Sequence, residues 1–219
     1  ASWIELNERL RHRDLLPQRQ RLTRWFLARL ANALPFRVRV EGELPQQPML
    51  WVANHVSWSD IPLLGALTPL SFLSKAEVRD WPVAGWLANK AGTLFIRRGS
   101  GDSSQVNQQL AAHLQQERHL LIFPEGTTTD GTALRTFHGR LLSSAIDSGV
   151  PLQPVAIRYL RDGQPCPIAP WVGDDGMLDH LLRMLSSDIA EVEIRLLSPL
   201  SSQDSSRNQL ARQAQEAIA

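Results

Sequence analysis

The sequence contains a single cysteine and no long apolar run, and each shortage excludes a class of protein. Cys166 has no partner in the chain, so an internal disulfide and a paired-cysteine metal or redox site are both excluded. No stretch reaches the roughly 18 consecutive apolar residues of a transmembrane helix, so we expect no membrane span within the printed chain. A Gly-x-Ser-x-Gly motif is also missing, which counts against a serine hydrolase or a thioesterase.

Net charge is also small, at +1 over 219 residues. A nucleic-acid-binding protein would be more basic and would carry a recognised binding motif, so this class is disfavoured. The charge is nevertheless uneven, because residues 1–39 hold nine arginines against three acidic residues, and the remainder is acidic in balance. A basic end of this kind indicates contact with an anionic surface such as a membrane, although a solvated basic helix face would give the same composition.

Residues 1–36 are expected to form an amphipathic helical arm in front of a single domain at residues 37–219. Two helices are predicted between residues 3 and 34, separated near Leu16-Pro17. One broad side of the second helix is apolar and borders Trp25, and its members are Leu22, Phe26, Leu27, Leu30 and Leu34. This side fits docking on a membrane, and packing on the domain itself fits the pattern equally well.

Short apolar runs alternate with helical stretches over the rest of the chain. Strands are expected at residues 37–42, 49–53, 70–73, 93–96, 120–123, 154–159 and 192–197. Helices are expected directly after residue 59 and at residues 102–117, 139–149 and 205–218, with one long loop at 161–176. His113 and His119 read as residues flanking a surface helix end, so no metal-ligand cluster is expected. The alternation predicts an α/β domain with a mixed, mostly parallel sheet of about seven strands flanked by helices.

The first candidate site is the segment Asn54-His55-Val56-Ser57-Trp58-Ser59-Asp60, which follows an expected strand. It places His55 at the carboxyl end of that strand, where α/β proteins build their sites. A histidine five residues before an aspartate can form an imidazole–carboxylate pair, which would fix the ring tautomer and make the other nitrogen a base. The spacing is weak by itself, because a helix-capping aspartate beside an unrelated histidine would look the same.

Three further segments accompany it. Residues 123–127, Phe-Pro-Glu-Gly-Thr, also follow an apolar strand, so they can face the same crevice, and Gly126 would let a ligand approach the backbone closely. Residues 92–98 end in Arg97 and Arg98, which suit an anionic headgroup, although adjacent strand residues point to opposite faces and only one can line the crevice. Residues 150–157 form a proline-bounded apolar strand. A solvated turn and ordinary surface arginines would explain these segments singly.

In this order and spacing, the four segments resemble the glycerolipid acyltransferase family, typified by the 1-acylglycerol-3-phosphate acyltransferases. The resemblance covers about residues 35–200. The family's blocks NHxSxxD, GxxFIxR and FPEGTR are matched by Asn54, His55, Ser57 and Asp60, by Gly92, Phe95, Ile96 and Arg98, and by residues 123–127.

The resemblance implies direct transfer of a fatty acyl group from acyl-CoA or acyl carrier protein to the free hydroxyl of a lysolipid. His55 would be the catalytic base and Asp60 would orient it, with no cofactor and no metal. The residues expected to bind substrate are Asn54, Ser57, Lys75, Arg98, Glu125, Gly126, Thr127 and Thr128. We expect the enzyme on the cytoplasmic face of the inner membrane, either peripheral or anchored by a segment outside the printed sequence, and we expect no nucleic-acid partner.

One position departs from the family pattern. The arginine expected after FPEGT is Thr128, so a bidentate phosphate partner is missing, and Asp130 adds a negative charge nearby. Third blocks of this kind look similar to those of lyso-ornithine lipid acyltransferases, whose acceptor carries an amine and a carboxylate instead of a phosphate. Arg97, Arg98 or Arg135 would have to compensate for a phosphate acceptor. Lysophosphatidic acid is the first expectation and lyso-ornithine lipid the second; a non-catalytic lipid-binding protein would not need both His55 and Asp60.

Overall fold

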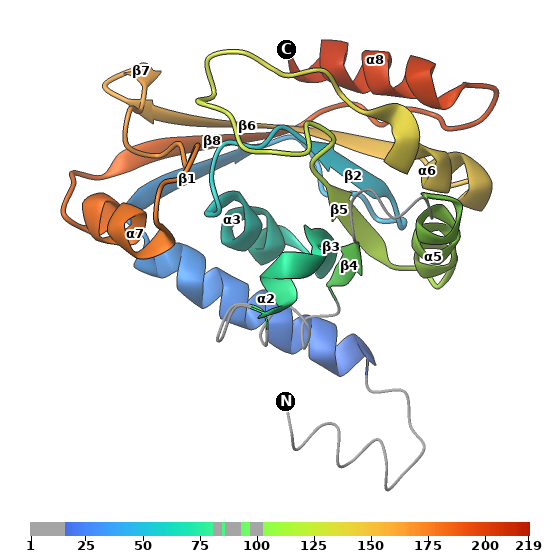
Figure 1. Cartoon of the computed structure of the whole chain (residues 1–219), viewed down its shortest axis with the longest axis horizontal. Helices are drawn as coiled ribbons and strands as arrows, with labels where there is room; N and C mark the ends of the chain where they lie inside the picture. Colours follow the sequence, from blue (N-terminus) through green and yellow to red (C-terminus); the bar gives the residue numbers. More distant parts are fainter. Residues whose placement is uncertain (1–15, 81–84, 86–92, 97–102) are drawn as a thin grey trace, which may run out of the picture.

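The computed structural model describes residues 16–80, 85, 93–96 and 103–219 (Figure 1). The first expected N-terminal helix, Arg97 and Arg98 lie outside these ranges. The α-helices are α2 (Leu16–Ala33), α3 (Asp60–Leu67), α5 (Ser103–Gln115), α6 (Ser143–Ser148), α7 (Met177–Leu185) and α8 (Arg207–Ile218), and the 3-10 helices are η1 (Ala76–Asp80) and η2 (Gly139–Leu142). The strands are β1 (Phe36–Glu41), β2 (Leu50–Ala53), β3 (Leu70–Lys75), β4 (Leu94–Ile96), β5 (His119–Ile122), β6 (Leu152–Arg161), β7 (Gln164–Pro165) and β8 (Ala190–Leu196).

The described strands form one eight-stranded sheet in the order β1-β8-β6-β2-β5-β3-β4, with β7 paired to β6. Strands β4, β3, β5, β2 and β6 run parallel to one another, whereas β8 is antiparallel to β6 and parallel to β1. The carboxyl ends of the five parallel strands and the amino ends of β1 and β8 therefore meet at one edge. The predicted mostly parallel mixed sheet is confirmed. The additional strand, β7, lies inside the segment 161–176, so the prediction of one long loop there is wrong.

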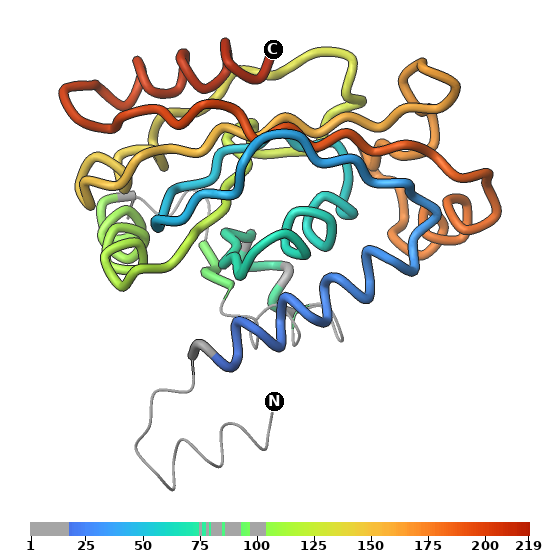
Figure 2. Tube along the Cα trace, turned by 180° about the vertical axis from the view of Figure 1, so that it is seen from behind, coloured from blue at the N-terminus to red at the C-terminus, as the bar shows by residue number. Residues whose placement is uncertain are grey.

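Helices cover both faces of this sheet. Successive residues of β2 point to opposite faces, and each face has its own buried core. Leu50 and Val52 pack on one side with residues of α5, α6 and α8, among them Leu110, Leu114, Ala145 and Leu210. Trp51 and Ala53 pack on the other side with α3 and the inner side of α2, among them Leu63, Leu64 and Ala31. Figure 2 shows these layers from behind, with α8 on one side of the sheet and α2 and α3 on the other.

Helix α2 lies against α3, and its residues divide between an inner and an outer side. Leu27 packs against the core, and it comes so close to Gly65 of α3 that a Cβ at that position would clash with its Cδ1. Leu22, Trp25 and Phe26 remain between 37% and 57% exposed. The helix therefore combines packing on the domain with an outward apolar side. Within the described ranges, no helix is long and apolar enough to cross a bilayer.

The two histidines around the end of α5 are not surface residues. His113 is 8% exposed, because it shares a side of α5 with Leu110 and Leu114, which pack against the sheet. His119 is half-buried at the start of β5, and its Nδ1 accepts hydrogen bonds from the Met49 N–H and the Trp51 indole, both of 3.2 Å. Both histidines flank the exposed end of α5, as expected, but their own side chains are buried or half-buried.

Candidate active site

The site begins where β2 ends. Asn54 directly follows the strand, and its amide exchanges two hydrogen bonds with the backbone of Ile157 on β6, of 2.9 Å from Nδ2 and 2.8 Å to Oδ1. The side chain is buried and its amide is committed to the neighbouring strand. Asn54 thus continues the pairing of β2 with β6 by one residue and fixes the point at which the chain turns away from the sheet.

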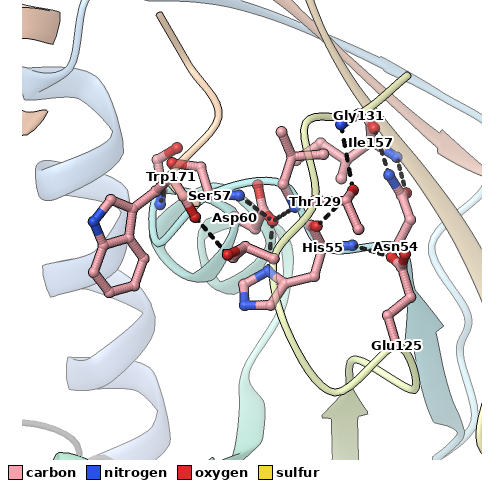
Figure 3. A network of polar contacts seen from close by, with 12 residues as sticks. Asn54, His55, Ser57, Asp60, Glu125, Thr129, Gly131, Ile157 and Trp171 are labelled. Atoms are coloured by element: carbon pink, nitrogen blue, oxygen red, sulfur yellow. Dashed lines mark hydrogen bonds and ion pairs between the residues drawn. The ribbon is translucent and has the colours of Figure 1, made fainter. Parts of the chain in front are cut away.

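His55 and Asp60 form the expected pair across this turn (Figure 3). The ring Nδ1 lies 2.8 Å from Asp60 Oδ2, with the histidine side chain 17% exposed and the aspartate fully buried. The same oxygen accepts the backbone N–H groups of Val56 at 2.8 Å and Ser57 at 3.0 Å. Because Oδ2 is already an acceptor for two N–H groups, the ring proton belongs on Nδ1, which leaves Nε2 with a lone pair.

The second carboxylate oxygen of Asp60 has a partner that the sequence motifs do not include. Tyr159 of β6 donates its hydroxyl to Oδ1 at 2.5 Å, and the Ser59 hydroxyl lies 2.8 Å from the same phenol oxygen. Burial, and secondarily the charge of Asp60, raise the pKa of Tyr159 well above its ordinary value. The phenol therefore stays protonated and acts as a donor to the carboxylate.

Glu125 fixes the other side of the loop at residues 54–60, which is called the catalytic loop below. It is buried, and its two oxygens accept the backbone N–H groups of His55 and Arg135, both at 2.8 Å. The Phe123 ring stacks on the His55 imidazole with the centroids 3.8 Å apart and the planes at 11°. Gly126 has a positive φ of 75°, which lets the chain turn sharply between these two residues and the segment that follows. The third block thus orients His55 through both its backbone and its ring.

Residues after this block are tied to the catalytic loop by hydrogen bonds. The Thr129 N–H donates to the carbonyl of His55 at 2.8 Å. Thr128 donates its hydroxyl to the carbonyl of Trp171, whose own N–H donates to the carbonyl of Val56 at 2.9 Å. The segment around Trp171 therefore forms one wall of the site, and Thr128 joins that wall to the third block.

The remaining predicted residues are placed unequally. Ser57 is fully buried behind the loop, and Thr127 is half-buried beside Gly126. Lys75 is the last residue of β3, and only its backbone is described. Arg98 lies outside the described residues. Among the described residues, no group of three or more His, Cys, Asp or Glu is placed to hold a metal ion, and the expectation that no cofactor is needed stays a prediction.

Sequence reasoning missed Tyr159, Thr129 and Trp171 as parts of this site. For Tyr159 a signal was present, because it is the only tyrosine of the sequence and stands two residues after Ile157, on the same face of β6. Trp171 lies in a Gly- and Asp-rich segment without a regular pattern, so no spacing in the sequence indicated its contacts. The assembled arrangement can accept a proton from a hydroxyl group at Nε2 of His55 and hold the resulting charge beside Asp60.

A mixed α/β sheet with a histidine–aspartate pair at the end of β2 is an arrangement that can support general-base catalysis. Comparisons with known proteins identify the family. The family profile described as "Acyltransferase" matches residues 36–158. The chain therefore belongs to the acyltransferase family, which confirms the predicted resemblance and enzyme class.

Several relatives are similar over most of the chain. A lyso-ornithine lipid O-acyltransferase of Pseudomonas aeruginosa is 66% identical over 218 residues, covering 100% of this chain and 84% of that protein. An enzyme of the same name from Brucella abortus is 35% identical over 210 residues, covering 89% of this chain and 79% of that protein. A 1-acyl-sn-glycerol-3-phosphate acyltransferase of Neisseria gonorrhoeae is 37% identical over 157 residues, covering 70% of this chain and 62% of that protein.

A solved structure is similar in fold. The crystal structure of the 1-acyl-sn-glycerophosphate acyltransferase from Thermotoga maritima aligns with a TM-score of 0.70 at 22% identity, covering 99% of this chain and 85% of that one. At this identity the likeness concerns the fold, and it agrees with the α/β class predicted from the sequence.

Proposed function

We propose that this acyltransferase transfers a fatty acyl group from a thioester to the hydroxyl of a lyso-ornithine lipid, giving an ornithine lipid. The observation that carries the proposal is the 66% identity, over the whole chain, to a protein named for that reaction. Relatives named for the phosphate acceptor are less identical and match less of the chain. This reverses the order of the two acceptors expected from the sequence.

The third block supports the same choice. Thr128 occupies the position of the expected arginine, and its hydroxyl donates to the carbonyl of Trp171. A neutral side chain committed to the backbone does not supply the two parallel N–H donors with which arginine binds a phosphate. The headgroup of an ornithine lipid carries an amine beside its carboxylate, and a third block without this arginine and with Asp130 nearby suits that amine better than a doubly charged phosphate.

In the proposed mechanism, Nε2 of His55 takes the proton from the acceptor hydroxyl as its oxygen attacks the thioester carbonyl carbon. The new C–O bond of the ester forms, the C–S bond breaks, and the imidazolium returns its proton to the leaving thiolate. Asp60 holds the ring in the required tautomer and stabilises its protonated form. No covalent acyl-enzyme intermediate is needed, because the acceptor attacks directly.

The residues around the pair act by positioning it. Asn54 and Glu125 fix the backbone of the catalytic loop, and Tyr159 and the loop N–H groups hold the Asp60 carboxylate. The acyl donor is the thioester of CoA or of acyl carrier protein, and no metal or cofactor takes part. Of the residues expected to bind substrate, Gly126, Thr127 and Thr128 are half-buried. Lys75 and Arg98 stay expected headgroup-binding residues on the grounds of the sequence motif alone.

The enzyme associates with the lipid layer that contains its acceptor. The outward side of α2 supports this, because Leu22, Trp25 and Phe26 are exposed and the Arg29 guanidinium lies 5.6 Å from the Trp25 ring centroid. Aromatic and aliphatic side chains interleaved with arginines suit the interface of an anionic membrane. Since CoA and acyl carrier protein are the donors, the association is with the cytoplasmic face of the inner membrane.

The test is acyl transfer by the purified protein to lyso-ornithine lipid and lysophosphatidic acid of matched chain length, each offered with acyl-CoA and with acyl carrier protein. A higher kcat/KM for lyso-ornithine lipid is expected. Preference for lysophosphatidic acid would overturn the acceptor assignment. His55→Ala serves as the control that any transfer observed comes from this site.

A further inference from the structure

Helix α7 has one side anchored in the protein and one side of exposed aliphatic residues. His180 and Met184 are buried at 0% and 2% exposure. Leu178, Leu182 and Leu185 are each more than half exposed on the opposite side, and Ile189, four residues beyond the end of the helix, is 63% exposed. Single exposed leucines are ordinary, but three leucines on adjoining turns of one helix side, with an exposed isoleucine shortly after the helix, form an apolar surface of the kind that marks an interaction site.

This surface lies at the edge of the sheet that carries the candidate active site. α7 leads into β8, whose amino end meets the carboxyl end of β2 at that edge. Met184 lines a small cavity together with Pro35 and Phe36, so the end of α7 adjoins the junction between α2 and β1. Figure 1 shows α7 on the same side of the sheet as α2 and α3. The apolar surface of α7 and the exposed side of α2 therefore belong to one layer of the molecule.

The anchored side of α7 is connected to the catalytic loop. Nδ1 of His180 accepts the indole N–H of Trp58 at 2.9 Å, and Trp58 lies between His55 and Asp60 in the sequence. Nε2 of His180 lies 3.0 Å from the carbonyl of Ile168 and 3.1 Å from that of Pro170, to which it donates. The helix is thus attached both to the catalytic loop and to the segment that forms the Trp171 wall, so its exposed side is held at a fixed position relative to His55.

We propose that the aliphatic surface formed by Leu178, Leu182, Leu185 and Ile189 docks on the lipid layer from which the acceptor enters the site. The inference rests on the proposed function in one respect, namely that the acceptor is a lipid. An amphipathic helix with this arrangement buries its apolar side in the boundary between headgroups and acyl chains. Docking there places the catalytic loop, through His180 and Trp58, next to the lipid surface.

The charges near the surface exclude electrostatic attraction to an anionic partner as the basis of docking. Asp174, Asp175, Asp179 and Asp188 are close to it in the sequence, and Arg183 is paired with Asp175. These carboxylates repel an acidic protein and anionic lipids alike, so the surface suits an uncharged apolar layer. Docking by α7 is therefore driven by burial of its leucines and works on uncharged vesicles, whereas the arginines of α2 respond to anionic lipids.

Insertion can be observed directly with a fluorescent probe. The only cysteine of the sequence, Cys166, is buried, so a new exposed cysteine can be labelled selectively with an environment-sensitive fluorophore. We would label Leu182→Cys on α7 and, as the matched control, Gln213→Cys on the exposed side of α8, which covers the other face of the sheet. With phosphatidylcholine vesicles, a blue shift is expected for the label on α7 and none for the label on α8.

Two results would overturn the proposal. One is the lack of any difference between the two labels on addition of vesicles. The other is a blue shift of the α7 label without vesicles that grows with protein concentration, which would show that a second copy of the chain covers the surface instead. Neither fluorescence measurement depends on turnover, so the experiment tests the docking proposal even if the acceptor assignment fails.

A kinetic comparison then links docking to catalysis. Leu178→Gln combined with Leu182→Gln should lower the rate on vesicle-embedded lyso-ornithine lipid by about tenfold or more and leave the rate on detergent-dispersed acceptor unchanged. Leu44→Gln is the control, because this exposed leucine follows the carboxyl end of β1 at the opposite edge of the sheet. Equal losses in vesicles and in detergent would contradict a docking role.

Discussion

Tyr159 holds the side of the Asp60 carboxylate that faces away from His55, through a hydrogen bond of 2.5 Å to Oδ1. The two residues are 99 positions apart and come from β6 and from the start of α3. His55 and Tyr159 therefore bind opposite oxygens of one buried carboxylate. The strength with which Asp60 supports the protonated imidazole depends on how much of its negative charge the phenol takes up.

Replacement of Tyr159 by Phe should change the pH dependence of the reaction. Without the phenol donor, more of the carboxylate charge remains to stabilise the protonated imidazole formed during the reaction. The acidic limb of the kcat/KM profile should move upward, and the rate at neutral pH should fall by about tenfold. Profiles of both proteins between pH 5 and 9 would measure the shift.

Ser59→Ala is the matched control for that experiment. It removes the hydroxyl that bonds Tyr159 and leaves the bond between Tyr159 and Asp60 in place. Its pH profile should follow that of the unmodified enzyme. A Tyr159→Phe profile that drops uniformly without shifting would mean that the tyrosine acts only through packing.

Removal of His55 should affect catalysis alone, whereas removal of Asp60 should affect both catalysis and folding. His55→Ala eliminates the base, so turnover should become undetectable, while the free energy of unfolding stays close to that of the parent. Asp60→Ala should lower kcat by about 10³-fold through misorientation of the ring. It should also destabilise the protein by about 1–3 kcal/mol per buried donor left unsatisfied, because the N–H groups of Val56 and Ser57 lose their acceptor. Turnover assays and denaturant unfolding measure both effects, and retained turnover in His55→Ala would refute the mechanism.

Much of the fold was predictable because strands and helices impose a local period on the sequence. The apolar runs that form β2 and β5 are buried on both faces, so they read as continuous hydrophobic segments. Their carboxyl ends necessarily meet at one edge of a parallel sheet, so the motif positions alone predict that His55 and Glu125 lie near each other. Gly149, expected as a helix end, closes α6 with a φ of 72°.

Other parts of the site depend on contacts without a local period. Asn54 bonds the backbone of Ile157, and His180 bonds Trp58 across 122 residues, so no spacing within a motif indicates either partner. The sequence analysis did not predict α7, which directly follows a Gly- and Asp-rich segment. The exposure of its leucines could not be predicted either, because the sequence pattern would be the same if they packed in the core.

Thr128→Arg should restore recognition of a phosphate headgroup. A guanidinium at this position offers two parallel donors to phosphate oxygens, so the ratio of kcat/KM values should move toward lysophosphatidic acid by about tenfold. The substitution also removes the hydrogen bond to the Trp171 carbonyl. Thr128→Val removes that bond without adding charge, so it should lower both activities without changing their ratio. An unchanged ratio in Thr128→Arg would place headgroup selection elsewhere.

The buried side chain of His113 should make the protein less stable in mild acid. Burial, and secondarily Arg118, lower the pKa of His113 from 6.5 to about 4. The neutral form is therefore favoured in the folded state, and the unfolded state binds more protons once the pH falls below 6.5. Stability from this residue is complete above that value and is lost progressively toward pH 4, which amounts to about 2 kcal/mol at pH 5.

The variant His113→Leu tests this assignment. The substitution removes the titrating imidazole from the side of α5 that carries Leu110 and Leu114. In the parent protein, Nε2 of His113 has no hydrogen-bond partner among the described residues. Denaturant unfolding at pH 7 and pH 5 should show a smaller difference between the two conditions in the variant than in the parent. Stability at pH 7 should be maintained, because a leucine adds apolar contact where the imidazole left a buried nitrogen. If the variant lost stability between the two pH values as steeply as the parent, the acid sensitivity would have to come from His119 or His180, whose pKa values burial also lowers.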